Sequence, residues 1–243
     1  MYPLKTYYKK TGLFNDIPLR VPSRTINDKE NFYPFVLYFN SNKGFSQYIN
    51  QDVELSIIYN FGNFSSNKKY SNYFNSNSDY YSSFYGVYGI KTNDGTPFGF
   101  NQDDIDIDLL SKMPEYDQKY LVLPSIGLLP KNVTFKYKIK NIKENINYID
   151  SNNWIKVDSI IKTNSPLHKY KKHHNGYIQY GIPPESNNIK EDYPIIDLYG
   201  RMYIKFFEEY DSTIVFYILA NDKSTVNKID KYILSNSYIN KNK

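Results

Sequence analysis

The sequence predicts a mainly β protein, an antiparallel β-sandwich or jelly roll with an extended N-terminal arm and two or three short helices. Aromatic residues make up 18% of the 243 residues, and such side chains fit pleated surfaces and bury large areas. The only alanine, the best helix former, is Ala220. Apolar runs recur between turn signals, with no long helical crossover. An AT-rich genome also encodes much Asn, Lys, Ile and Tyr, so composition supports the β class without establishing it.

The first 31 residues are typical of an arm. They contain Pro3, Pro18 and Pro22 and several lysines, and they show no sustained period of 2 or 3.6. We expect residues 1–31 to contact other subunits and residues 32–243 to form a single domain. The candidate partner-binding residues of the arm are Tyr7, Tyr8, Lys9 and Lys10.

Strands are expected over Phe35–Phe39, which is short and apolar, and over Val53–Phe61, where apolar and polar residues alternate. A β-hairpin is expected from Phe84–Thr92 and Thr96–Phe100, because the intervening Asn93-Asp94-Gly95 is typical of a tight turn.

A tract rich in Tyr, Asn and Ser at about 63–83 is expected to be an insertion. Its composition resembles that of adaptable contact surfaces. Tyr80 and Tyr81, together with Tyr85 just after the tract, are therefore candidate contacts to a sugar or to a partner subunit.

Residues 103–112 read as a short helix with acidic residues in its first turn. Strands are expected over 121–123 and 133–140. In the second of these, Val133, Phe135, Tyr137 and Ile139 face one way, and lysines face the other. The lysine row consists of Lys136, Lys138 and Lys140, extended by Lys143.

This lysine row has two interpretations. It could follow a nucleic-acid backbone, or it could prevent edge-to-edge aggregation of an exposed strand. We favour the second, because the net charge of +5 is too small to require a nucleic-acid partner.

The remaining chain adds strands over 155–161, 177–182, 195–198, 202–207 and 213–219, the last continuously apolar and therefore fully buried. The spacing of Val226, Ile229 and Ile233 predicts a helix, with Asp222 or Ser224 as its N-cap.

No catalytic, cofactor or metal site is predicted. The chain lacks cysteine, which excludes disulfides and thiolate ligands. Its three histidines, His168, His173 and His174, lie in one lysine-rich segment that would repel a cation. The acidic stretch from Asp103 to Asp108 lacks the Gly and Glu of an EF-hand loop. Glu208-Glu209 is the only local suggestion of a paired carboxylate.

The N-terminus has no apolar signal-peptide region, and no apolar run is long enough for a membrane span. We therefore expect assembly in a host cytoplasm and localisation in a virion. The favoured hypothesis is a non-enzymatic structural subunit of a virus or phage particle, as a capsid, collar or tail component. Its partners would be copies of itself and other structural proteins, with nucleic acid weakly supported.

Two alternatives remain open. One is a ligand- or carbohydrate-binding β-sandwich, of the receptor-binding or lectin-like kind, that uses the tyrosine-rich loop. The other is an enzyme whose carboxylates meet only in space, which would require two of them to face each other in a deep cleft.

Overall fold

The chain folds around one seven-stranded antiparallel sheet with strand order β2-β3-β6-β12-β11-β10-β9. The structure is a computed structural model, and it describes residues 12–21, 35–40, 42–61, 65–67, 70–72, 83–101, 104–125, 128–164, 194–232 and 234–239. The strands are β2 (Phe35–Asn40), β3 (Val53–Phe61), β6 (Ser83–Thr92), β9 (Phe135–Tyr148), β10 (Ser151–Asn164), β11 (Ile195–Phe207) and β12 (Ser212–Ala220).

Three two-stranded sheets accompany the large one. They pair β1 (Leu19–Arg20) with β13 (Tyr238–Ile239), β4 (Ser65–Asn67) with β5 (Tyr70–Asn72), and β7 (Phe100–Asn101) with β8 (Asp104–Ile105).

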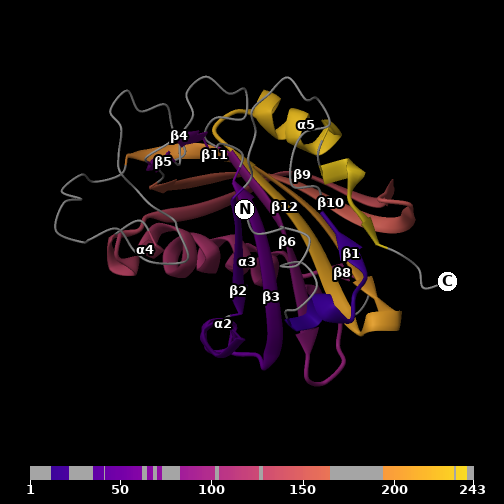
Figure 1. The fold of residues 1–243 in the computed structure, drawn as a ribbon. Coiled ribbons are helices and arrows are strands. Elements are labelled where there is room, and N and C mark those ends of the chain that lie inside the picture. The colour runs from indigo at the N-terminus through magenta and orange to yellow at the C-terminus, as the bar shows by residue number, and fades with distance from the viewer. Residues whose placement is uncertain are drawn as a thin grey trace.

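Helices lie on both sides of the large sheet (Figure 1). The principal ones are α2 (Asn42–Ile49), α3 (Ile107–Tyr116) and α5 (Lys223–Tyr232). The Asp106 side chain caps α3 by accepting from the Leu109 N–H at 2.9 Å, and Asp222 caps α5 by accepting from the Thr225 N–H at 2.7 Å. Shorter elements are η1 (Gly12–Asn15), the π-helical turn η2 (Asp117–Val122), α4 (Leu123–Ser125), η3 (Pro130–Asn132), η4 (Glu208–Tyr210) and η5 (Leu234–Asn236).

Each face of the sheet builds its own core. The first core joins the sheet to α2, α3 and α4 through residues such as Phe45, Met113 and Leu123. The second core joins the opposite face to η1, β1 and α5 through residues such as Phe14 and Ile229. Because strand side chains alternate between faces, β12 contributes to both cores, and all nine of its residues are buried.

Most sequence-based strands are confirmed. β2, β3 and β12 match their predicted ranges closely, the strand predicted over 133–140 is the first part of β9, and 195–198 and 202–207 are parts of one strand, β11. The mainly β, antiparallel class is confirmed as well. A second large sheet, as a sandwich or jelly roll requires, is not among the described residues, because helices and short segments cover both faces instead.

Three predictions need correction. Residues 12–21 are not a free arm, because Leu13, Ile17 and Val21 are buried in the second core. Thr96–Phe100 does not form a hairpin with β6, whose antiparallel partners are β3 and β12. The segment 121–123 is helical rather than a strand, because it continues the π-helical turn into α4.

The predicted strand over 177–182, residues 1–11 and 22–31 of the arm, and most of the 63–83 insertion lie outside the described residues. In the part of the chain that the structure describes, every helix is too short or too polar to cross a membrane.

Candidate polyanion-binding face

Four cross-strand rows place lysines of β9 and β10 on one face of the sheet. Lys136 pairs with Lys162, Lys138 with Ile160, Asn141 with Asp158, and Lys143 with Lys156. Residues directly opposite each other in an antiparallel pair project to the same face. We call this set of eight residues the lysine face: Lys136, Lys138, Asn141, Lys143, Lys156, Asp158, Ile160 and Lys162.

A β-bulge brings Lys143 onto this face. The pairing shifts between Ile139↔Ser159 and Asn141↔Asp158, which leaves Lys140 as the extra residue of β9. Without the bulge, alternation would put Lys143 on the face opposite Lys138. The structure therefore groups Lys136, Lys138 and Lys143, whereas Lys140 of the predicted row is exposed but has no partner in the β9–β10 ladder.

Exposure falls from the sheet edge inwards. On β9, Lys136, Lys138 and Lys143 are all exposed. On β10, Lys162 is exposed and Lys156 is half-buried. The next strand, β11, continues the rows with Asp197, Tyr199, Arg201 and Tyr203, of which Arg201 and Tyr203 are buried.

Arg201 anchors the inner end of the lysine face. Its Nε donates to Asp158 Oδ1 at 2.7 Å, and its Nη1 donates to Asp230 Oδ2 of α5 at 2.6 Å. Burial alone would lower the pKa of Arg201, but hydrogen bonding and the charges of these two carboxylates raise it. This buried ion-pair network holds α5 against β10 and β11.

Two tyrosines complete the network around Asp230. The Tyr203 hydroxyl donates to Asp230 Oδ2 at 2.6 Å, and the Tyr148 hydroxyl donates to Oδ1 at 3.3 Å. The two rings stack with centroids 3.7 Å apart. Burial first, and then the Asp230 charge, raise the pKa of both hydroxyls, so both remain protonated donors at neutral pH.

Lys156 lies where positive charges crowd. Its Nζ is 3.7 Å from Asp158 Oδ2, but that carboxylate already accepts from Arg201. Burial chiefly, and then repulsion by Arg201 with a smaller contribution from Lys143, lower the pKa of Lys156. A negatively charged ligand beside these three cations would relieve that repulsion.

The other predicted contact residues are not brought together. Tyr85 is fully buried in β6, on the side of the strand that faces the second core. The prediction that it contacts a sugar or a partner is therefore wrong. Tyr7, Tyr8, Lys9, Lys10, Tyr80, Tyr81 and the three histidines lie outside the described residues.

Sequence reasoning missed Lys156, Lys162 and Arg201. A signal for the first two was present, because Ile155, Val157, Ser159 and Ile161 alternate along a predicted strand. This alternation leaves the even-numbered residues 156–162 on the other side. Nothing in the sequence indicated that this strand pairs with the lysine row in this register.

No family model, curated protein or solved structure matches this chain.

A cleft of about 450 Å³ lies elsewhere, between η1 and the β11–β12 turn. Four carboxylates line it, and the Lys91 Nζ is 3.3 Å from Asp211 Oδ2. Asp16 and Glu209 are solvent-exposed, whereas Glu54 and Asp211 are partly buried. The lining residues are Leu13, Asp16, Ile17, Glu54, Lys91, Glu209, Tyr210, Asp211 and Ser212.

Proposed function

We propose that this chain is a non-enzymatic structural subunit of a large assembly, a virus or phage particle in which it serves as a capsid, collar or tail component. The supporting observation is the open edge of the large sheet. Within the described residues β9 has a neighbouring strand on one side only, and its residues 140–145 are all exposed. Such an edge presents unpaired backbone N–H and C=O groups to another chain.

The lysines restrict how that edge can be used. Two β9 strands from two copies would bring like charges together, which is unfavourable in a β-ladder. We infer that β9 meets a different segment of the neighbouring copy. Such head-to-tail contacts generate rings or open helical filaments, which are the architectures of collars, tails and shells.

A non-enzymatic role is supported by how the buried charges are used. Asp158 and Asp230 are both engaged by Arg201, and Asp230 also accepts from two tyrosine hydroxyls. These carboxylates contribute to attaching α5 to the sheet, which is a structural task.

Native mass measurement and particle imaging of the full chain test the proposal. We expect higher-order assembly, lost in Ile142→Asp, because Ile142 is 36% exposed on the open edge. Tyr232→Asp is the matched control, since Tyr232 is 46% exposed on α5. A strict monomer at high concentration, or equal assembly of Ile142→Asp, contradicts the proposal.

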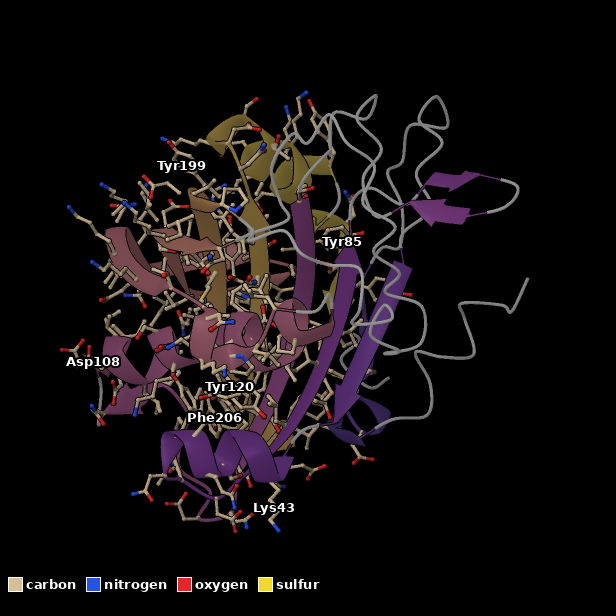
Figure 2. All side chains as sticks on the ribbon, turned by 90° about the vertical axis from the view of Figure 1, so that its left-hand side faces the viewer. Lys43, Tyr85, Asp108, Tyr120, Tyr199 and Phe206 are labelled. Carbon is tan, nitrogen blue, oxygen red and sulfur yellow. The ribbon has the colours of Figure 1, made fainter. Side chains whose placement is uncertain are left out.

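A tyrosine cluster favours carbohydrate binding as a second candidate. Tyr120 is 44% exposed, and its ring centroid lies 5.5 Å from that of Tyr48 and 5.2 Å from that of Tyr116 (Figure 2). Glu115 and Lys119 form an ion pair beside these rings. Aromatic faces with adjacent charged groups suit a sugar ring.

Glycan-array binding by the full chain tests this candidate. Tyr120→Ala would abolish the binding and Tyr120→Phe would retain it, because stacking needs only the ring. Absence of binding by the parent chain would rule the candidate out.

A further inference from the structure

The lysine face places like charges directly opposite each other twice. Lys136 is opposite Lys162, and Lys143 is opposite Lys156. Like charges in directly opposed positions destabilise a sheet. Among the described residues, the carboxylates in register with these lysines and Arg201 are Asp158, which Arg201 already engages, and Asp197, which is opposite Lys162.

Protection of the sheet edge accounts for only part of this pattern. Lysines on the edge strand β9 discourage pairing with other chains. Lys156 and Lys162, however, are on β10, which has β9 on one side and β11 on the other. A strand paired on both sides needs no such protection, so edge protection does not account for the two β10 lysines.

An apolar and aromatic row interrupts the charges. Ile160 is opposite Lys138 on one side and Tyr199 on the other, and both Ile160 and Tyr199 are partly exposed. Lys138 and Lys162 border the Ile160 side of this row, and Asp197 and Arg201 flank Tyr199. Tyr199 packs partly against the second core and keeps a partly exposed ring surface on which a base could stack. Lys136 and Lys138 lie roughly 6.6 Å apart along β9, Lys156 and Lys162 lie roughly 20 Å apart along β10, and the whole face spans roughly 20–25 Å.

We propose that the lysine face, with Tyr199, binds single-stranded nucleic acid. The lysines neutralise successive phosphates, and Tyr199 with Ile160 receives a base face, a combination used for single strands without sequence preference. A duplex has its base faces stacked inside and offers no ring to this platform. The proposal goes beyond the assembly role and stands whether or not the chain assembles.

Fluorescence anisotropy of the full chain with a labelled, mixed-sequence single-stranded oligonucleotide tests the lysines. The pair Lys138→Gln/Lys162→Gln should weaken binding and reduce the slope of log K against log salt by about 1.4, since each single-strand phosphate contact contributes about 0.7. The matched control is Lys43→Gln/Lys112→Gln, which removes the same charge from α2 and α3. Figure 2 shows Lys43 at the end of the molecule away from Tyr199.

Substitutions of Tyr199 test the stacking contact separately. Tyr199→Ala should weaken binding roughly 5- to 160-fold, the range for one base–aromatic stack, while Tyr199→Phe should retain it. Thermal unfolding of both variants identifies any loss of affinity that follows from a loss of folded protein, and the Phe variant still tests the prediction if the Ala variant does not fold.

Several outcomes would overturn the proposal. An equal loss of oligonucleotide affinity in the Lys43→Gln/Lys112→Gln control would show that the binding reflects general charge attraction. Tighter binding to a duplex of the same sequence, or equal binding to polyglutamate, would exclude a single-stranded nucleic acid as the ligand. Increased self-association of Lys138→Gln/Lys162→Gln with unchanged oligonucleotide binding would leave edge protection as the sole role of the lysines.

Discussion

β12 and β9 belong to the same sheet but differ sharply in burial. All nine residues of β12 are buried between two cores, whereas β9 has no fully buried residue over its 14 positions. Apolar burial at the sheet centre stabilises the fold. Among the described residues, the β9 edge buries no side chain fully, carries charges and a bulge, and has a strand partner on one side only. The difference indicates that the sheet centre determines the fold and that the edge is available for contact.

The largest expected effect concerns the segment that attaches to the sheet centre. Removing residues 1–21 would take five apolar side chains from the second core, at roughly 1.5–3 kcal/mol each, a total comparable with the whole stability of a typical domain. We expect this truncation to unfold, as measured by circular dichroism. The buried residues are Leu13, Phe14, Ile17, Leu19 and Val21.

Removal of residues 1–11 alone is the control and should leave a folded chain. This result separates the segment that packs on its own subunit from the part of the arm that we expect to contact a neighbour. Retention of structure by the 1–21 truncation would show that η1 and β1 contribute little to the second core.

A pair of substitutions compares the two strands directly. Phe216→Ala in β12 should lower the free energy of unfolding by about 3–5 kcal/mol, because its ring packs against Trp154 and leaves a cavity. Ile142→Ala on β9 should change it by less than about 0.5 kcal/mol, as for other exposed positions. Denaturant unfolding measures both. Similar losses from the two variants would contradict the division between centre and edge.

The Arg201 network joins the two regions and should have an intermediate effect. Asp230→Asn would leave Arg201 with Asp158 alone and weaken the acceptor of two tyrosine hydroxyls. We expect a loss of about 2–3 kcal/mol, below the 3–5 typical of fully buried pairs, because the Asp230 side chain is 13% exposed. Glu144→Gln, on the exposed part of β9, is the control and should have little effect in the same denaturant titration.

The sequence could predict the strands whose pattern is local. Continuous apolarity identified β12, and alternation identified β3 and the first part of β9. The failures depend on contacts between distant segments. The turn at 93–95 is present, with Gly95 at φ 75°, but β6 pairs with β3 and β12 rather than with the residues that follow the turn. Pro18 and the lack of a regular period in residues 12–21 concealed their apolar anchors.

Only the local part of the candidate site was predictable from the sequence. Lys136 and Lys138 follow from alternation along one strand, whereas the bulge at Lys140 brings Lys143 onto the same face. Their partners on β10 depend on the hairpin register and on the bulge at Lys140, which no local pattern specifies. The burial of Tyr85 was missed although it lies in a predicted strand, because no local pattern indicates that both faces of that strand are covered.

The smallest expected effect is a pH dependence above the ordinary tyrosine pKa of 10.0. Burial and Asp230 raise the pKa of Tyr203, so the folded state retains a proton that the unfolded state loses. Stability should therefore be fully present below pH 10.0 and fall as the pH rises above it. Tyr203→Phe should show a shallower decline in the same alkaline range. An equally steep decline would indicate that Tyr203 ionises freely.

Lysine-reactivity footprinting with and without a single-stranded oligonucleotide tests the contact role of the edge most directly. We predict protection of Lys136, Lys138, Lys143 and Lys162 from acylation, with Lys43 and Lys112 unchanged. Protection that is uniform over all these lysines, or absent from β9 and β10, would contradict the assignment of this edge as the contact surface.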